Sequence, residues 1–261
     1  EQIREPAVPF EPPGRLKGEL AFRGLNFGYQ ANQPVLRDFT LTIKPGETLA
    51  VVGPTGSGKS TLIRLLVRFY DVDDGMIFID GEDINRYSSG VLRQRIGVVL
   101  QDFHIFSGSI LENIRLGNPA ISRADAIRAA DAVQATPFIE RLPEGFDTHL
   151  NERGQNLSQG ERQLLAFARV LVADPEILVL DEATASIDTQ TEAIVQSALE
   201  TLMQGRTAII IAHRLQTIQS ADRIVVLKHG EIREVGRHQE LMAAKGIYYT
   251  LSQLQFQEVI Q

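Results

Sequence analysis

Four short and almost continuous apolar runs mark the chain. They are Thr48–Val52, Ile96–Leu100, Ile177–Leu180 and Ala208–Ala212. Runs of this length predict buried strands, because a strand that is covered on both faces is apolar throughout. Residues 223–228 show another strand pattern, and residues 189–204 and 214–220 have helical spacing. Strands that alternate with helices predict a parallel sheet with right-handed crossovers.

A second strand pattern precedes and follows the first apolar run. Residues 18–52 alternate in strand fashion, with turn signals at Gln30–Pro34 and Lys44–Glu47. Met76–Asp80 is predicted to be a strand that ends in a hairpin turn at Asp80–Gly81. We expect a small antiparallel β layer in this fold, and Lys59–Phe69 to form a helix.

The middle of the chain changes character. Alanine, isoleucine and valine recur at helical spacing between residues 124 and 133, with Ser122 as a candidate cap. We expect a mostly helical insert at about 102–172 within an α/β domain of residues 18–261. Residues 238–257 are predicted to form one or two terminal helices.

Residues 1–17 are rich in proline, which disfavours a helix and predicts an extended connector. The chain begins with Glu1, so we expect a piece of a longer polypeptide. No apolar run approaches the ~18 residues of a membrane helix. Any membrane-spanning part is therefore expected elsewhere, with residues 1–17 as the linker to it.

Composition narrows the class of protein. A chain of 261 residues suits one large α/β domain, with or without an inserted subdomain. The 26 basic and 33 acidic residues give a net charge of −7, which argues against nucleic acid as a partner. Cysteine is absent, so disulfides and thiolate metal sites are excluded, and a reducing cytoplasmic setting fits.

A glycine-rich loop follows the apolar run at 48–52. Residues 53–60 read Gly-Pro-Thr-Gly-Ser-Gly-Lys-Ser and match the pattern G-x-x-x-x-G-K-[S/T] in full. Such glycines let backbone N–H groups converge on phosphate oxygens, and the following helix adds its positive dipole end. Lys59 can then reach the β- and γ-phosphates, and Ser60 can hold Mg²⁺. A glycine-rich turn with a surface lysine is the alternative, which the combination of strand, loop and helix disfavours.

The run Ile177–Leu180 leads into two carboxylates, Asp181 and Glu182. In parallel sheets, ligands bind at the carboxyl ends of the strands. There Asp181 can orient Mg²⁺, and Glu182 can polarise a water that attacks the γ-phosphate. Taken alone, the pair would be interpreted as a solvated acidic turn, and only the phosphate loop favours the catalytic interpretation.

Ser158-Gln159-Gly160-Glu161 opens a helix that we expect to run to about Ala173. Serine followed three residues later by glutamate predicts a capping box. The same helix start exposes N–H groups and a positive dipole end, so it is also a candidate anion site. The two interpretations are compatible.

These segments together resemble the ATP-binding domain of ABC transporters, in order from about residue 18 to 245. Residues 53–60 resemble the Walker A loop, Asp181–Glu182 the end of Walker B, and Leu157–Glu161 the signature motif. The resemblance also implies roles for single residues. Tyr29 would stack on adenine, Gln101 would be the lid glutamine, Asp188 would lie in the D-loop, and His213 would be the switch histidine.

The resemblance thus gives three sets of candidates. The catalytic candidates are Glu182, His213, Gln101 and Lys59; the nucleotide contacts are Tyr29, Gly53, Pro54, Thr55, Gly56, Ser57, Gly58, Lys59, Ser60, Thr61, Ser158, Gln159, Gly160 and Asp188; and the magnesium ligands are Ser60, Gln101 and Asp181.

The family implies a P-loop ATPase fold with ATP and Mg²⁺ as ligands. Two such domains, identical or paralogous, would dock head to tail, with each ATP between the Lys59 loop of one chain and the Ser158–Gly160 helix start of the other. The pair would power a transmembrane partner from the cytoplasmic face of the inner membrane. Glu152–Gly154 resembles the segment through which exporters contact that partner.

Two residues depart from the commonest signature, because Gln159 stands in place of glycine and Glu161 in place of glutamine. Gln159 matters only if that position needs a positive φ. A free carboxylate would repel a γ-phosphate, so we hypothesise that the Glu161 side chain is folded back onto its own helix start.

Residues 101–110 and Glu112–Ile114 resemble the exporter version of the segment after the lid glutamine. Phe103, Phe106 and Ile110 would be available to a membrane-domain helix, or would pack inside the helical insert. The alternative class is an ABC-type ATPase of DNA repair or chromosome organisation, or a non-transport ABC factor. Residues 61–156 lack the sustained heptads of the former, and one cassette is too few for the latter.

Overall fold

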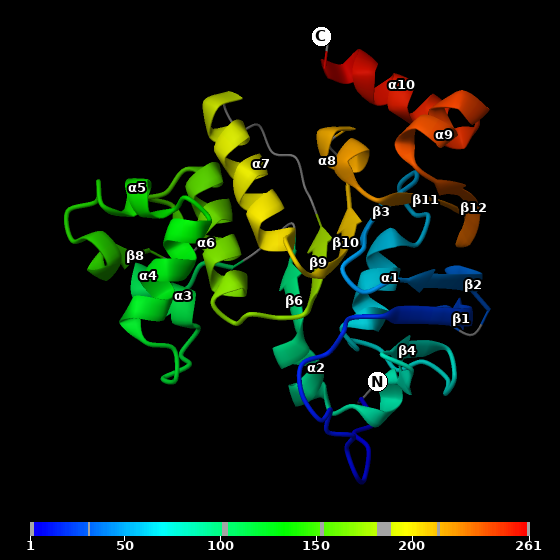
Figure 1. Ribbon diagram of the computed structural model, residues 1–261, viewed down its shortest axis with the longest axis horizontal. Helices are drawn as coiled ribbons and strands as arrows, with labels where there is room; N and C mark the ends of the chain where they lie inside the picture. The colour runs from blue at the N-terminus through cyan, green and yellow to red at the C-terminus, as the bar shows by residue number, and fades with distance from the viewer. Residues whose placement is uncertain are drawn as a thin grey trace. The chain divides into compact units, whose positions relative to one another are not determined.

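The computed structural model describes residues 3–30, 32–100, 104–151, 154–181, 189–212 and 215–259. The chain divides into two compact units, which Figure 1 shows as ribbons. The first comprises Glu1–Ile96, Glu176–Glu182 and Gly205–Gln261, and the second comprises Gly97–Pro175 and Ala183–Gln204. Each unit is therefore assembled from stretches that lie far apart in the sequence.

A largely parallel sheet forms the centre of the first unit. Its strands β3 (Thr48–Val52), β9 (Ile177–Asp181), β10 (Thr207–Ile211) and β11 (Arg223–Lys228) lie in the order β11-β3-β10-β9. Their side chains are buried except at strand ends, as in sheets that are covered on both faces. The predicted parallel sheet is thus confirmed. The remaining apolar run, Ile96–Leu100, forms β6 (Ile96–Val99), which leads into the second unit.

The sequence pattern missed one strand of this sheet. β12 (Glu231–Gly236) pairs antiparallel with β11. Its residues are half-buried or exposed and include several charges, so no apolar run marks it. β12 is stabilised as a strand by its pairing with β11, because its own residues bury little apolar surface.

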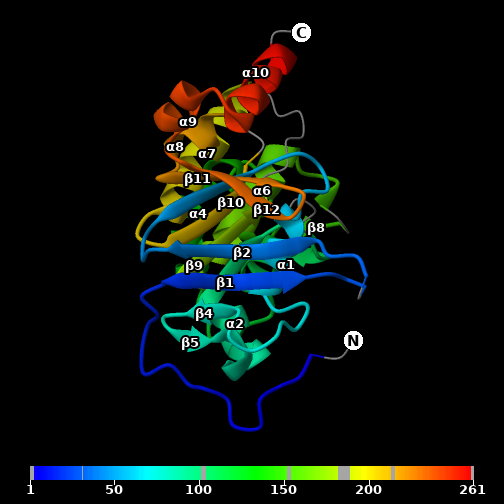
Figure 2. The ribbon, with the colours of Figure 1, turned by 90° about the vertical axis from the view of Figure 1, so that its right-hand side faces the viewer.

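A four-stranded antiparallel sheet lies in the same unit, in the order β2-β1-β4-β5 (Figure 2). Its strands are β1 (Leu20–Phe27), β2 (Leu36–Ile43), β4 (Ile77–Ile79) and β5 (Glu82–Asp83). Asp80 and Gly81, at φ of 51° and 82°, form the tight turn between β4 and β5. The predicted antiparallel layer and its hairpin turn are confirmed.

Helix α1 (Lys59–Leu66) follows the glycine-rich loop and is shorter than predicted. The prediction extended it to Phe69, but Arg68 takes a left-handed backbone at φ 53°. The Arg68 side chain is only 3% exposed and donates to the carboxylate of Asp71 and to the carbonyl of Tyr87. These tertiary bonds end the helix where local propensity would have continued it.

The other helices of the first unit surround the two sheets. They are η1 (Ile84–Arg86), α2 (Ser89–Arg95), α8 (Leu215–Ser220), α9 (His238–Ala244) and α10 (Ile247–Val259). The segment predicted at 214–220 is α8, and the predicted terminal region forms two helices.

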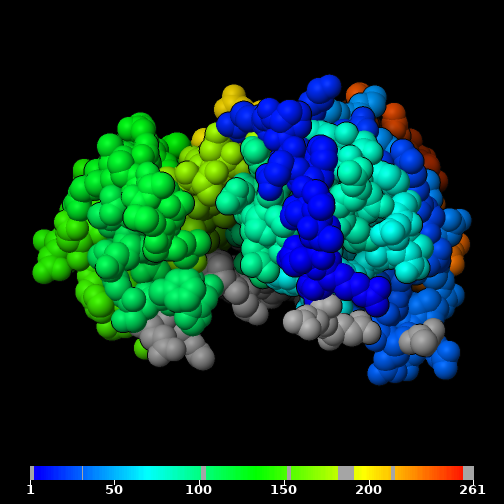
Figure 3. Space-filling view, turned by 90° about the horizontal axis from the view of Figure 1, so that it is seen from below, coloured from blue at the N-terminus to red at the C-terminus, as the bar shows by residue number. Residues whose placement is uncertain are grey.

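The proline-rich residues 3–17, here called the N-terminal strap, contain neither helix nor strand, as predicted. The strap is nevertheless docked on the first unit, where Figure 3 shows it in dark blue across the surface. The Phe10 ring packs edge-on against Tyr87 at 5.2 Å, and the Phe10 N–H donates to the carbonyl of Arg86 at 2.7 Å. Near its start, the carboxylate of Glu5 accepts from Ser89 at the beginning of α2.

The second unit is mainly helical around α6 (Gln159–Leu171). This helix contacts α3 (Ile110–Arg115), α4 (Arg123–Ala132) and α7 (Thr189–Met203). The unit also contains α5 (Thr136–Ile139), η2 (Gly145–Asp147) and the short pair β7 (Gly108–Ser109) and β8 (His149–Leu150). Ser122 caps α4, as predicted. The bounds of about 102–172 for a helical insert stay a prediction.

Among the described residues, every helix is too short or too polar to span a lipid bilayer.

Candidate nucleotide-binding site

The glycine-rich loop lies at the carboxyl end of β3, which has β11 on one side and β10 on the other. Gly53 has a φ of 154°, and a Cβ added there would lie 2.0 Å from the carbonyl oxygen of Leu227. Gly58 has a φ of 106°, and a Cβ there would lie 2.8 Å from the Leu36 side chain. Both positions require glycine, so the loop keeps its backbone amides uncovered.

Lys59 is the first residue of α1, and its ammonium is folded onto the loop. Its Nζ donates to the carbonyl of Gly53 at 2.7 Å and to that of Pro54 at 3.1 Å. Burial lowers the pKa of Lys59 from its ordinary value, and the negative charge of Asp181 acts in the opposite direction. An anion bound in this loop would therefore meet a cation that is poorly solvated by water.

Ser57 provides a test of whether the loop fits a phosphate. The residue is 2% exposed, and within the described part of the chain its hydroxyl has no hydrogen-bond partner. A buried hydroxyl without a partner is costly, so native proteins normally satisfy it. Together with the glycine cradle and Lys59, this hydroxyl fits a phosphate-bearing ligand.

Asp181 ends β9, and strand register places it level with Val51, two residues before the phosphate loop. It pairs with Ile211 of β10, which in turn pairs with Val51 of β3. Neighbouring strands are about 4.8 Å apart, so Asp181 lies two strand spacings from the end of β3. Its negative charge favours the protonated form of Lys59 and so opposes the lowering of the lysine pKa by burial. Carboxylate and hydroxyl oxygens, as in Asp181 and Ser60, are the donors that Mg²⁺ prefers.

Tyr29 follows β1 and lies beside α1, the helix that begins with Lys59. Its hydroxyl is 3.0 Å from Oγ1 of Thr61, and it accepts from Nη1 of Arg64 at 3.3 Å. The rings of Phe27 and Tyr70 pack against it edge-on. The residue is 43% exposed, which leaves part of the ring available to a planar ligand.

The signature-like segment begins α6 in the second unit. Oγ of Ser158 accepts from the N–H of Glu161 at 3.3 Å, and the Glu161 carboxylate accepts from the N–H of Ser158 at 2.8 Å. The predicted capping box is confirmed, and the Glu161 side chain is folded back as hypothesised. Gln159 lies in the helix itself and does not have a positive φ, so the departure from glycine brings no backbone strain.

Several candidates lie outside the described residues. They are Gln101, Glu182, Asp188 and His213, together with Phe103 and the pair Glu152–Arg153. Of the described candidates in the first unit, the phosphate loop and Asp181 follow the carboxyl ends of β3 and β9, which flank β10, and Tyr29 contacts α1, the helix that follows the loop.

The exporter-like segment after residue 103 is held by two polar side chains. Asn113 accepts from the N–H of Phe106 at 2.9 Å, and Arg169 donates to the carbonyl of His104 at 2.7 Å. Burial lowers the pKa of Arg169 to about 10. Ile110 is 0% exposed, so it packs within the unit, whereas Phe106 is 51% exposed. These apolar residues were expected either to contact a membrane-domain helix or to pack inside the helical insert. Ile110 does the second.

The structure also brings in residues that sequence reasoning missed. The N–H of Gly230 donates to the carbonyl of Ser57 at 3.1 Å, and a Cβ on Gly230 would lie 2.1 Å from the carbonyl oxygen of Val35. Arg64 and Tyr70 contact Tyr29. No motif marks these residues, because their roles arise from contacts between segments distant in sequence.

Known proteins resemble this chain over most of its length. A probable multidrug resistance ABC transporter ATP-binding/permease protein of Bacillus subtilis is 48% identical over 98% of this chain and 37% of its own length. An ATP-dependent lipid A-core flippase of Syntrophus aciditrophicus is 50% identical over 94% of this chain and 40% of its own length. The chain thus spans about two fifths of these relatives.

A solved structure gives the same picture. The structure of a bacterial Atm1-family ABC exporter with ATP bound superposes with a TM-score of 0.88 at 40% identity, covering 97% of this chain and 44% of the other. The family model described as ABC transporter matches residues 36–185, which is more than half of the chain. From its phosphate loop, its capped signature helix and these matches, the chain belongs to the ABC transporter family.

Proposed function

We propose that this chain is the ATP-binding and ATP-hydrolysing motor domain of a membrane exporter. The observation that carries the proposal is the glycine cradle of residues 53–58, with Lys59 folded onto it and Asp181 acting on that lysine. The names of the relatives and the ATP-bound exporter neighbour support it.

In this proposal the loop binds the triphosphate of ATP. Backbone N–H groups of the loop and the Ser57 hydroxyl donate to phosphate oxygens, and Lys59 turns from its loop carbonyls to the β- and γ-phosphates. Mg²⁺, held by Ser60 and Asp181 together with Gln101, would supply charge neutralisation at the phosphates. Tyr29 stacks on the adenine.

Hydrolysis needs a group that prepares the attacking water. By resemblance we assign Glu182 as the general base, which takes a proton from that water as it attacks the γ-phosphorus, while the bond from the γ-phosphorus to the β–γ bridging oxygen breaks and ADP leaves. Gln101 and His213 would orient water and γ-phosphate. Asp188 would contact the nucleotide site from the D-loop.

We further propose that the complete site needs two chains. The Ser158–Gly160 helix start, with Gln159, would bind the γ-phosphate that rests on the Lys59 loop of a second ABC domain, of the same or a paralogous kind. The positive end of the α6 dipole and its free N–H groups suit an anion. The Glu161 carboxylate is already engaged by the Ser158 N–H, which limits its repulsion.

The proposed partner beyond this dimer is the transmembrane domain of the exporter, at the cytoplasmic face of the inner membrane. The relatives named as ATP-binding/permease proteins support this arrangement, as does the exposed ring of Phe106. Residues 1–17 would be the linker from that domain. The net charge of −7 remains unfavourable for nucleic acid as a partner.

The alternative was an ATPase of DNA repair or chromosome organisation, or a non-transport ABC factor. The relatives named above are a probable multidrug resistance ABC transporter and a lipid A-core flippase, and residues 104–151 form short helices and strands within the second unit. Both observations favour the exporter.

Two substitutions test the proposal on the purified chain. Lys59→Ala should weaken Mg·ATP binding by about tenfold to a hundredfold, because a charge-assisted contact to phosphate is lost. Glu182→Gln should leave binding nearly unchanged and slow phosphate release by at least about a hundredfold. Titration calorimetry measures the first, and a phosphate-release assay with and without EDTA measures the second.

Unchanged hydrolysis in Glu182→Gln would remove Glu182 as the base. A wild-type chain that does not bind Mg·ATP, alone or with its natural partner domain, would overturn the whole proposal.

A further inference from the structure

We propose that Arg64 and Tyr70 are positioning residues for the nucleotide, acting through Tyr29. Together they fix the Tyr29 ring in one orientation before ATP arrives. The inference rests on the proposed function, in which that ring stacks on the base, and it adds two residues to which no role has been assigned.

The first part of the support is at the Tyr29 hydroxyl. It is 3.0 Å from Oγ1 of Thr61 and accepts from Nη1 of Arg64 at 3.3 Å. Thr61 and Arg64 are three residues apart in α1, so their side chains lie on one face of that helix. The tip of the ring is therefore tied to the same helix that begins with Lys59.

The second part of the support is along the ring. Phe27 and Tyr70 meet Tyr29 at centroid distances of 5.3 Å and 5.1 Å, with interplanar angles of 86° and 75°. Phe27 and Tyr70 also contact each other at 5.8 Å, so the three rings form a closed cluster. Edge-to-face packing of this kind is favourable beyond the area it buries.

Hydroxyl bonds and ring contacts together restrict both side-chain torsions of Tyr29. A ring that is already ordered loses less rotational freedom when a base stacks on it, which raises affinity. The Tyr29 hydroxyl is bonded to α1, and α1 begins directly after the phosphate loop. The ring that stacks on the base is therefore also fixed in position relative to the loop that binds the phosphates. Arg64 fixes the position of the Tyr29 hydroxyl, and Tyr70 fixes the orientation of the Tyr29 ring plane.

The test is a double-mutant cycle measured by titration with Mg·ATP. Arg64→Met and Tyr70→Ala should each weaken binding by about twofold to tenfold in the otherwise wild-type chain. In a Tyr29→Leu background, which has no ring to position, neither substitution should weaken binding further. Tyr70→Phe keeps the ring and should bind as wild type. Arg64→Lys keeps a donor and should recover part of the loss.

A second titration uses inorganic tripolyphosphate with magnesium, which has no base. Its affinity should not change in Arg64→Met or Tyr70→Ala. Equal losses for ATP and tripolyphosphate would overturn the inference, because Arg64 would then act on the phosphates directly. So would losses that persist in full in the Tyr29→Leu background, or no loss in either variant.

These outcomes are separable from failure of the proposed function. If the wild-type chain does not bind Mg·ATP at all, the proposed function fails. If it binds Mg·ATP and the cycle shows no coupling to Tyr29, only the positioning roles of Arg64 and Tyr70 fail. Thermal unfolding of each variant confirms that the fold is retained.

Discussion

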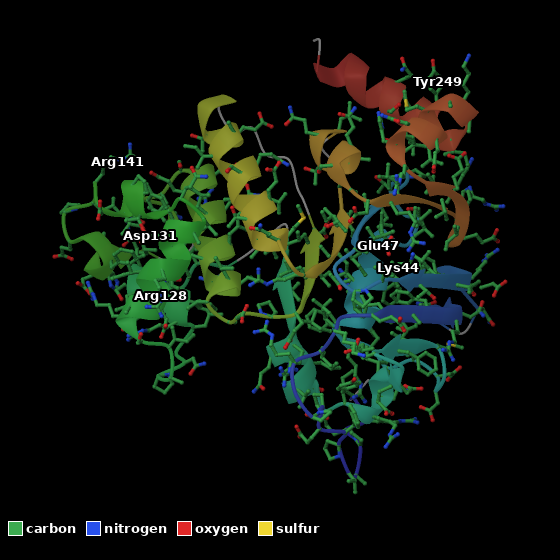
Figure 4. The ribbon with its side chains drawn as sticks, in the orientation of Figure 1. Lys44, Glu47, Arg128, Asp131, Arg141 and Tyr249 are labelled. Atoms are coloured by element: carbon green, nitrogen blue, oxygen red, sulfur yellow. The ribbon has the colours of Figure 1, made fainter. Side chains whose placement is uncertain are left out.

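The carboxylate of Glu161 is shared between two partners at the start of α6. One oxygen accepts from the N–H of Ser158 at 2.8 Å, and the other lies 3.7 Å from the guanidinium of Arg141, which Figure 4 labels on the segment after α5. A negative charge at a helix N-terminus is favourable, and the backbone bond draws it away from a ligand. This geometry explains how glutamate fits where the family commonly has glutamine.

Replacing Glu161 with glutamine should therefore have little effect. Glutamine also completes a capping box, and the Arg141 side chain that faces Glu161 is exposed, so the free energy of unfolding should change by less than about 1 kcal/mol. The ATPase rate of the assembled transporter should change only slightly. Ser158→Ala is the matched control for stability, since loss of the N-cap should cost about 1 kcal/mol. A large gain in rate for Glu161→Gln would show instead that the charge restrains the site.

At the scale of elements, the N-terminal strap shows how a segment without regular structure is held in place. Arg68 makes the central contacts that hold the strap. The Arg68 guanidinium donates to the carbonyls of Tyr87 and Arg4 and to the carboxylate of Asp71. Glu5 adds a bond to the first turn of α2. The left-handed backbone of Arg68 is unfavourable by itself. The bonds of Arg68 and Glu5 offset this cost and hold the strap against the end of α1 and the start of α2.

Arg68→Met should release the strap and lower the free energy of unfolding by about 2–3 kcal/mol, because hydrogen bonds of a buried charged group are lost. Trypsin cleavage after Arg15 and Lys17, followed by mass spectrometry, should become faster. Phe10→Ala is the companion variant, which removes the ring contact with Tyr87 and leaves the Arg68 bonds in place. If cleavage in Arg68→Met stays at the wild-type rate while stability falls, Arg68 supports only the domain beneath the strap.

At the scale of the whole molecule, the residues that we propose to bind ATP belong to different units. The phosphate loop, Asp181 and Tyr29 belong to the first, and the helix start at Ser158 belongs to the second. In the head-to-tail arrangement that we propose, each ATP takes one half from each of two chains. Such an arrangement predicts complementation between defective chains.

Lys59→Ala and Ser158→Arg should each be nearly inactive alone, since both sites of either homodimer are defective. A mixed dimer pairs the intact Lys59 loop of one variant with the intact Ser158 of the other, so one of its two sites is complete. Mixing the purified variants should therefore restore phosphate release to a measurable fraction of the wild-type rate. No recovery in mixtures that form dimers would contradict a site shared between chains.

The sequence alone determined the local features of this protein, because each depends on neighbours in the chain. The apolar runs predicted the buried strands, Asp80–Gly81 the hairpin turn, and Ser158 with Glu161 the capping box. The phosphate loop was likewise readable, since its glycines and lysine are consecutive.

Which distant residues meet depends on the packing of the folded chain. It placed β12 beside β11, ended α1 at Leu66 through Arg68, and brought Arg64 and Tyr70 to Tyr29. The physical reason differs among the three cases. β12 is too polar for its own sequence to mark it as a strand. α1 ends early because tertiary bonds of Arg68 outweigh local helix propensity. The ring cluster brings together segments that are distant in the sequence, so no local pattern predicts it.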